Sequence, residues 1–346
     1  MKLLLVSTGS PVSTADVWAG LMTAFQRAGV DLVHYNLEGR LDAAVRWLDM
    51  CWERSDKKLS KPSQADAIYF ASTMMIERAL RFMPDWVFYV TANYVHPDVF
   101  MLLKRAGFKV AILFTESPND DQWQIPIAGA ADACWTNERS SLAKFREVQP
   151  RTYYYQHAYD PAVHCPVGPD PHAPTHDAVF VGTGWAERIE LFEAVDWMGI
   201  DVGLYGFWDW IGESSPLKPY IAGGMMENGL TAKLYRNAKV GLNMHRLSVG
   251  VGLGTPRIDY AESLNPRCYE LAACGLFYLM DWRAELDDVF GGAVPTFSGA
   301  AELGDKLRYY LAHDEERRQM AERLPGLVAG HTFDARVKDI LRELEA

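Results

Sequence analysis

The stretch Glu262–Gly275 reads Glu-Ser-Leu-Asn-Pro-Arg-Cys-Tyr-Glu-Leu-Ala-Ala-Cys-Gly and outlines one α/β unit. Asn265 is a good helix N-cap, and Pro266 suits the first helical position because its missing N–H is not needed there. The sequence therefore predicts a helix over Pro266–Cys274, followed by a buried strand over Phe277–Met280.

Short apolar runs alternate with amphipathic segments on both sides of this unit, which favours parallel sheets covered by helices. Strands are predicted over Lys2–Ser7, Val30–Tyr35, Ala67–Ala71, Trp86–Thr91, Val110–Phe114, Ala133–Trp135, Ala178–Val181, Val202–Tyr205 and Lys239–Asn243. Further helices are predicted over Ala15–Ala28, Asp98–Ala106, Arg188–Met198, Ala301–Ala312, Glu315–Leu324 and Phe333–Leu344.

A proline-rich segment divides this pattern in two, with six prolines between Pro150 and Pro174. Proline at this density removes amide donors and resists both helix and central strand. We expect two Rossmann-like doubly wound α/β domains facing a cleft, over 1–155 and 177–325, joined by a linker over 156–176. Ligands in such folds bind outside the carboxyl ends of the strands.

The composition is that of a globular chain of two domains, with 346 residues, 49% of them hydrophobic and 23% charged. Five cysteines without a CxxC pair indicate reduced thiols and argue against a zinc site. The apolar run Leu3–Val6 is too short for a secretory signal, and no run approaches the length of a membrane span. We expect a cytoplasmic chain without a membrane span.

The net charge of −11 is concentrated in the second half of the chain. Residues 1–165 hold 17 basic and 18 acidic side chains, whereas residues 166–346 hold 17 and 27. The acidic half is a poor surface for nucleic acid or anionic lipid. A polyanion would have to meet the first half, where Trp47 and Trp52 lie among six basic side chains: Arg40, Arg46, Arg54, Lys57, Lys58 and Lys61. We prefer a solvated helix and loop for this stretch.

The predicted helix start after Glu262 has the features of an anion site. Free backbone amides and Arg267 converge there, which suits a diphosphate. Glu270 lies one turn into the helix and Glu262 lies in the loop before it, and carboxylates accept hydrogen bonds from pairs of hydroxyls. A diphosphate flanked by such groups is typical of a nucleotide-sugar site, although an ordinary capped amphipathic helix has the same local pattern.

This stretch resembles the C-terminal half of GT-B glycosyltransferases, specifically the spore-maturation CgeB-like group, which is related to glycosyltransferase family 4. Glu262 and Glu270 have the spacing of that family's two glutamates, and Asn265, Arg267 and Tyr269 match the CgeB-like pattern. Other matching segments are Phe180–Gly184 with Arg188, Asp201–Gly206, Tyr235–Arg246, His157–Asp160 and His331–Phe333 with Arg336. The resemblance covers about residues 150–340 well and the first 150 in outline.

The resemblance implies a hexosyltransferase that uses a nucleotide sugar, such as UDP-glucose, and needs no metal or other cofactor. Glu270 would bind the ribose, and Glu262 would act on the transferred sugar. The diphosphate would lie on Arg188, Arg267 and the amides of Ser263, Leu264 and Asn265, which would stabilise the leaving group. Further donor contacts are expected from Gly182, Thr183, Gly184, Tyr205, Gly206 and Asn243. The family's lysine after Arg188 is absent, so Lys233 is the expected substitute.

The resemblance also implies that the first half binds the acceptor and that the final segment, 326–346, packs back towards the N-terminal domain. Glu116, after the strand Val110–Phe114, is the expected general base of an inverting enzyme or an acceptor-orienting group of a retaining one, and the spacing of the two glutamates favours retention. Asp120 is the second choice. The turn at Gly9 and Ser10 and the loop at His96 could meet the acceptor or the sugar, or serve as plain strand–helix turns.

The acceptor stays open between a polysaccharide, a lipid, a protein and a modified DNA base. One alternative is a phage-type DNA glycosyltransferase that acts on a hydroxylated nucleobase. A second alternative is a nucleotide-dependent oxidoreductase or epimerase, although the fingerprint Gly182–Glu187 has Glu187 in place of its third glycine. A third is a non-catalytic nucleotide-sugar binder.

Overall fold

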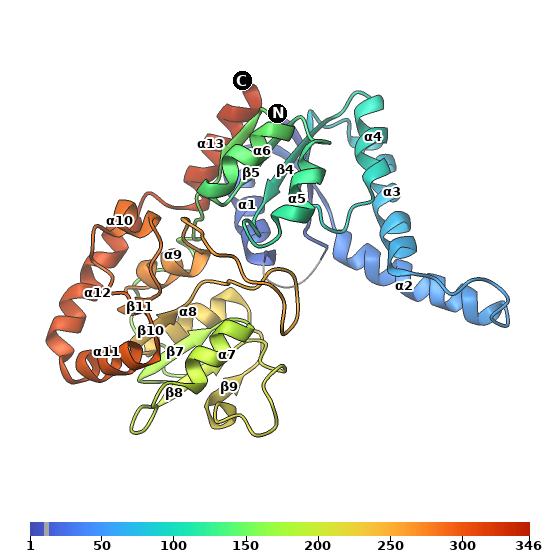
Figure 1. Ribbon diagram of the computed structural model, residues 1–346. Helices are drawn as coiled ribbons and strands as arrows, with labels where there is room; N and C mark the ends of the chain where they lie inside the picture. Colours follow the sequence, from blue (N-terminus) through green and yellow to red (C-terminus); the bar gives the residue numbers. More distant parts are fainter. Residues whose placement is uncertain (10–13) are drawn as a thin grey trace. The chain divides into compact units, whose positions relative to one another are not determined.

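The computed structural model describes residues 1–9 and 14–346, which form two compact units (Figure 1). Unit 1 comprises Met1–Tyr155 and Arg336–Ala346, and unit 2 comprises Gln156–Ala335. The chain therefore leaves unit 1 after Tyr155 and returns to it within the last helix, α13 (Phe333–Glu345). Each unit is built on one parallel sheet.

Unit 1 has a six-stranded sheet in the order β2-β1-β3-β4-β5-β6. Its strands are β1 (Lys2–Val6), β2 (Asp31–Tyr35), β3 (Trp86–Val90), β4 (Lys109–Phe114), β5 (Ala133–Thr136) and β6 (Thr152–Tyr154). Every residue of β3 is buried, as expected for a strand whose two faces are both covered. The chain moves to opposite sides of β1 through β2 and β3, so the carboxyl ends of β1 and β3 form the topological switch point.

The helices of unit 1 lie between these strands in sequence. They are α1 (Ala15–Arg27), α2 (Leu37–Arg54), α3 (Gln64–Phe82), α4 (Pro97–Arg105), α5 (Asp121–Ala128), the 3₁₀ turn η1 (Arg139–Ser141) and α6 (Leu142–Val148). The predicted strand over Ala67–Ala71 is wrong, because these residues belong to α3. Ser63 and Asp66 form a capping box that starts this helix, and Ala67, Ala71, Met75 and Ala79 are buried at helical spacing.

The basic stretch between Arg40 and Lys61 comprises most of α2 and the segment that follows it (Figure 1). Trp47 stacks on Phe70 of α3 with ring centroids 5.1 Å apart. Trp52 lies beneath the ammonium groups of Lys57 and Lys61. Trp47 thus contacts a side chain of α3, and Trp52 contacts side chains of the segment between α2 and α3.

Unit 2 has a five-stranded sheet in the order β11-β10-β7-β8-β9. Its strands are β7 (Ala178–Val181), β8 (Val202–Tyr205), β9 (Ile221–Gly223), β10 (Val240–Asn243) and β11 (Tyr278–Met280). The first three strands extend the sheet to one side and the last two to the other. The carboxyl ends of β7 and β10 are therefore the switch point, where a doubly wound fold binds its ligand.

The helices of unit 2 are α7 (Ala186–Glu193), the 3₁₀ turn η2 (Lys218–Tyr220), α8 (Asn228–Asn237), α9 (Pro266–Ala273), α10 (Glu285–Phe290), α11 (Ala300–Ala312) and α12 (Asp314–Val328). The predicted helix Arg188–Met198 starts earlier and ends at Glu193. Beyond it the chain turns so that the indole of Trp197 donates to the carbonyl oxygen of Phe192, and the ring is buried. Among the described residues, no helix is both long and apolar enough to cross a membrane.

Candidate functional site

Two glycine loops meet at the carboxyl edge of the unit 2 sheet. The amide of Gly182, after β7, donates to the carbonyl oxygen of Tyr205 at the end of β8. Gly206 has a φ of +118°, and a Cβ there would lie 2.3 Å from the carbonyl oxygen of Gly182. Gly184 is equally confined, since a Cβ would lie 2.5 Å from the ring of Trp208. Glycine is required here because backbone packs directly on backbone and on an aromatic ring.

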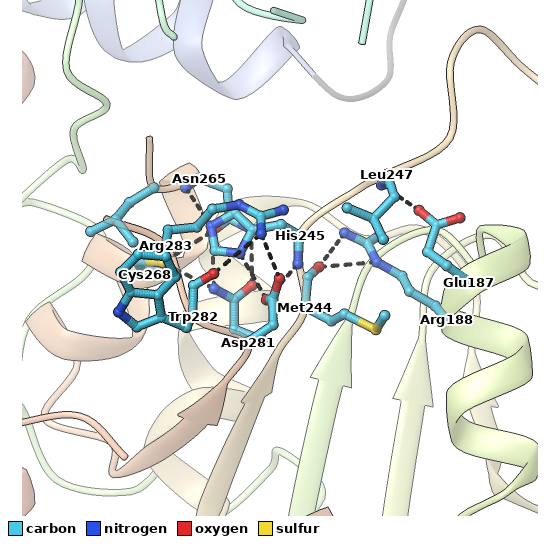
Figure 2. A network of polar contacts seen from close by, with 12 residues as sticks. Glu187, Arg188, Met244, His245, Leu247, Asn265, Cys268, Asp281, Trp282 and Arg283 are labelled. Carbon is cyan, nitrogen blue, oxygen red and sulfur yellow. Dashed lines mark hydrogen bonds and ion pairs between the residues drawn. The ribbon is translucent and has the colours of Figure 1, made fainter. Parts of the chain in front are cut away.

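Arg188 ties the loop after β7 to the loop after β10 (Figure 2). It lies in the first turn of α7 and is only 5% exposed. Its Nε and Nη2 donate to the carbonyl oxygen of Met244 at 3.1 and 2.5 Å, and its Nη1 donates to the carbonyl oxygen of Thr183 at 2.9 Å. The guanidinium is thus held by neutral carbonyl groups on both sides of the switch point.

Arg267 brings a second guanidinium to the same place from the first turn of α9. Its Nη2 lies 3.1 Å from where a Cβ of residue 182 would stand. The Cζ atoms of Arg188 and Arg267 lie 5.2 and 5.4 Å from the centre of the Phe180 ring. Within residues 1–9 and 14–346, neither guanidinium forms an ion pair with a carboxylate.

The electrostatics of Arg188 reflect this arrangement. Burial, and after it the positive charge of Arg267, lower the pKa of Arg188 to about 9. Two cations gathered without a bonded carboxylate form a site for an anion with more than one negative charge. We name this pair, with the loops of Gly182 and Asn265, the arginine cradle.

The start of α9 is fixed by a pair of side-chain amides. Asn265 caps the helix, since its Oδ1 accepts from the amide of Cys268 at 3.2 Å. Asn243, at the end of β10, exchanges two hydrogen bonds of 3.1 and 2.9 Å with the Asn265 amide. The sequence-based assignment of Asn243, Asn265 and Arg267 to one place therefore agrees with the geometry.

Two backbone amides expected to bind the diphosphate have partners within the protein. The amide of Leu264 donates to Glu285 Oε2 at 2.7 Å, and the amide of Asn265 donates to His245 Nε2 at 3.2 Å. Ser263, the third expected contact, is buried and is also engaged. The sequence analysis expected free donors at these positions, but the amides of Leu264 and Asn265 are already paired within the protein.

The two glutamates of the motif have different surroundings. Burial raises the pKa of Glu270 to about 7, against the opposing effect of Arg267. Glu262 is partly exposed in the preceding loop, where Tyr260 donates to its Oε1 at 3.0 Å. Glu270 therefore adjoins the cradle, whereas Glu262 is held by the loop itself.

Two expected donor contacts lie elsewhere. The ring of Tyr205 points back along its strand into the space beside Gly203. Its hydroxyl lies 2.8 Å from Nε2 of His176, a residue that precedes β7. Lys233 forms an ion pair of 2.8 Å with Asp170 of the proline-rich segment. Both expectations are corrected, because these polar groups are already paired away from the cradle.

The acidic candidates of unit 1 follow β4. Glu116 and Asp120 are partly exposed, and the amide of Asp120 donates to the carbonyl oxygen of Glu116. Asn137, after β5, exchanges hydrogen bonds of 3.0 and 3.1 Å with the backbone of Ser117. The loop that carries Glu116 is thus clamped to the neighbouring strand end.

Two further unit 1 candidates, Gly9 and His96, lie in the segments that follow β1 and β3. Gly9 has a φ of +79°, and its amide donates to Glu38 Oε1 at 3.0 Å. The Nδ1 of His96 accepts from the amide of Asp98 at 3.3 Å and caps α4. His96 therefore serves a structural role in this structure, and the expected contact at Ser10 lies outside the described residues.

The sequence analysis missed three residues that organise unit 2. His245 and Asp281 lie just beyond the ends of β10 and β11, with His245 Nδ1 2.8 Å from Asp281 Oδ1 (Figure 2). Glu187, in place of the third fingerprint glycine, accepts from the amides of Leu247 and Ser248 at 2.6 and 3.2 Å. The signal for the first two was a polar residue one or two positions after a predicted strand.

Part of the chain, lying mostly in unit 2, is similar to a known family. Residues 182–342 match the family described as "Glycosyl transferase-like". A search of curated proteins finds no relative of this chain.

Solved structures resemble the whole chain at low sequence identity. Sucrose-phosphate synthase from Thermosynechococcus elongatus matches with a TM-score of 0.66 and 12% identity over 99% of this chain and 97% of that one. HepE from Anabaena, solved with UDP-glucose, matches with a TM-score of 0.63 and 10% sequence identity over 99% of each chain. A putative UDP-N-acetylglucosamine 2-epimerase from Listeria monocytogenes matches with a TM-score of 0.60 and 12% sequence identity, over 99% of this chain and 95% of that one.

These likenesses confirm the predicted GT-B fold of two Rossmann-like domains. The family match supports the expectation of a transferase enzyme of the glycosyltransferase kind. The epimerase shares the same fold, so the fold alone does not separate the two activities.

Proposed function

We propose that this chain is a metal-independent glycosyltransferase that moves a sugar from a nucleotide diphosphate sugar, a UDP-sugar in the first instance, to a hydroxyl acceptor. The arginine cradle is the observation that carries the proposal. Gathering two cations in a partly buried site opposes folding, so their position is best explained by a ligand that brings the opposite charge.

The cradle fits the chemistry of the donor. In glycosyl transfer the bond between the anomeric carbon and the β-phosphate oxygen breaks, and the negative charge stays on the diphosphate. Arg188 and Arg267 would stabilise that charge as it develops, which is the role of a fixed cationic site in phosphate-leaving reactions. The acceptor hydroxyl forms the new bond to the anomeric carbon and gives up its proton.

The glutamates complete the proposed roles. Glu270, beside Arg267, would accept hydrogen bonds from the ribose hydroxyls of the donor. Glu262 would contact hydroxyls of the transferred sugar, and retention of the anomeric configuration is the stereochemistry we propose. Glu116, in unit 1, would orient the acceptor or accept its proton. HepE, solved with UDP-glucose, supports the choice of a UDP-sugar.

The decisive experiment measures donor binding. Titration calorimetry with UDP should detect binding to the wild type and none to Glu270→Ala. Glu213→Ala is the matched control, because Glu213 is an exposed glutamate of the same unit with no described partner. Unchanged UDP affinity in Glu270→Ala would remove the donor-site assignment.

A thermal-shift screen with nucleotide sugars and NAD(P) separates the competing functions. Stabilisation by NAD(P) alone would favour an oxidoreductase. Conversion of a free nucleotide sugar to its epimer, without acceptor, would favour an epimerase. Binding without transfer or donor hydrolysis would favour a nucleotide-sugar sensor.

The acceptor is tested separately. For a hydroxylated DNA base as acceptor, we expect a salt-dependent gel shift that is lost when Lys57 and Lys58 are changed to glutamate. A chain that transfers sugar without shifting DNA would direct the search to polysaccharide, lipid or protein acceptors. The cytoplasm, where nucleotide sugars are available, is the proposed location.

A further inference from the structure

His245 lies next to the arginine cradle without belonging to it. It follows β10 by two residues, and its side chain is 5% exposed. Its Nδ1 lies 2.8 Å from Asp281 Oδ1, which also accepts from the His245 backbone amide at 2.9 Å. Two contacts to one carboxylate fix the position of both the backbone and the ring.

The carboxylate of Asp281 determines which ring nitrogen carries the proton. Burial alone would raise the pKa of Asp281, but His245 and Arg283 lower it to about 2. The carboxylate is therefore ionised and accepts from Nδ1–H, which leaves Nε2 as an acceptor in the neutral imidazole. Nε2 faces the backbone amide of Asn265 at 3.2 Å (Figure 2).

This chain of contacts ends at the residue that starts α9. Asn265 is the N-cap of α9, and Arg267 follows two residues later in the first helical turn. The orientation of the Asn265 backbone therefore determines where the Arg267 side chain leaves the helix. On the basis of the proposed function, we propose that His245 is a positioning residue for the donor diphosphate, which holds Arg267 in the cradle through the Asn265 amide.

The arrangement also makes the cradle sensitive to acid. The charged groups that act on the His245 ring are Asp281 after β11, Arg283 in the loop before α10, and Arg188 of α7. Burial lowers the pKa of His245, and Asp281 opposes this effect. Once protonated, Nε2 carries a hydrogen and no longer accepts from the Asn265 amide. The N-cap residue Asn265 then loses this contact, Arg267 is less firmly positioned, and diphosphate binding weakens.

Two substitutions separate the two contacts of the ring. His245→Gln places an amide oxygen near the position of Nε2, so it keeps an acceptor for Asn265 but loses the donor to Asp281. His245→Asn keeps a donor near Nδ1 but does not reach Asn265. We expect UDP affinity close to wild type in the Gln variant and weakened by roughly tenfold or more in the Asn variant, because the Asn265 amide then lacks its buried acceptor.

The pH dependence of UDP binding distinguishes positioning from general support of the fold. Between about pH 8 and pH 5, the wild-type affinity should fall on acidification, whereas the Gln variant, which does not titrate, should lose this component. An unaltered pH profile in the Gln variant, or equal affinity in wild type and Asn variant, overturns the proposal. Melting curves check that both variants fold.

A ligand-free measurement keeps this proposal distinct from the proposed function. Hydrogen exchange of the segment 262–270 should be faster in His245→Asn than in wild type and His245→Gln. If exchange is faster in the Asn variant but the wild type does not bind UDP, then His245 does hold the start of α9, and the donor assignment is refuted. Equal exchange in all three proteins would refute the positioning role of His245, whether or not the protein binds UDP.

Discussion

Replacing Arg267 with methionine should make the protein bind UDP more weakly without making it less stable. The two guanidinium carbons of the cradle lie 5.2 and 5.4 Å from the centre of the Phe180 ring, so they are at most about 11 Å apart. At that limit of about 11 Å and an effective dielectric constant of about 20, two like charges repel by about 1.5 kcal/mol, and by more at a shorter distance. Methionine has a similar length and packs on the same ring, so most of the apolar contact is kept.

In the UDP complex, the substitution also removes a charge-assisted hydrogen bond from Arg267 to the diphosphate. A charge-assisted hydrogen bond contributes about 1.5–3 kcal/mol, which corresponds to an affinity loss of about 10- to 100-fold. We therefore expect a melting temperature equal to or above that of the wild type, together with this loss in calorimetric UDP affinity. The two effects have opposite signs because the cradle is strained for its ligand.

Arg308→Met is the matched control. Arg308 is an arginine of unit 2 that forms an exposed ion pair of 2.7 Å with Asp196. This control should change neither melting nor UDP affinity by much, since exposed ion pairs contribute little. A lower melting temperature with unchanged UDP affinity in Arg267→Met would show that Arg267 is a structural residue and would refute the cradle.

Three further outcomes are expected. Gly206→Ala should destabilise unit 2 by about 2 kcal/mol or more in chemical denaturation, because its Cβ would meet the Gly182 carbonyl, whereas Gly212→Ala, with open space, should be neutral. The raised pKa of Glu270 favours its protonated form in the folded chain; this stabilisation is complete below its ordinary pKa of 4.5 and is lost as the pH rises through about 7. As the pH rises from acidic to mildly alkaline, the melting temperature of Glu270→Gln should therefore increase relative to that of the wild type. Parallel plots of melting temperature against pH for the two proteins would contradict this reasoning. Glu116→Gln should retain UDP affinity but transfer sugar more slowly, and a wild-type transfer rate would remove Glu116 from the site.

The sheets were predictable because a strand covered on both faces must be a continuous apolar run, as β3 is. The same rule misassigned Ala67–Ala71, whose apolar run is too short to separate strand from helix by periodicity. The capping box at Ser63 and Asp66 was the local signal that decides the case.

The cradle was only partly predictable. Asn265 and Arg267 follow from a local helix start. The meeting of Arg267 with Arg188 was expected only from the family resemblance, because it depends on the strand order, which no short motif encodes. The side-chain directions of Tyr205 and Lys233 are set by tertiary partners, His176 and Asp170. Sequence position alone placed both near the donor, and packing directs both away from it.

The return of the chain to unit 1 has a consequence for biosynthesis. The indole of Trp135 donates to the Glu343 carboxylate at 2.6 Å, and Arg151 donates to the Glu343 carbonyl oxygen at 2.8 Å. A ribosome releases the whole of unit 2 before it releases these last residues. The first unit to be translated is therefore the last to complete its contacts, and in a nascent chain stalled before Glu343 the indole N–H of Trp135 and the guanidinium of Arg151 would lack these partners.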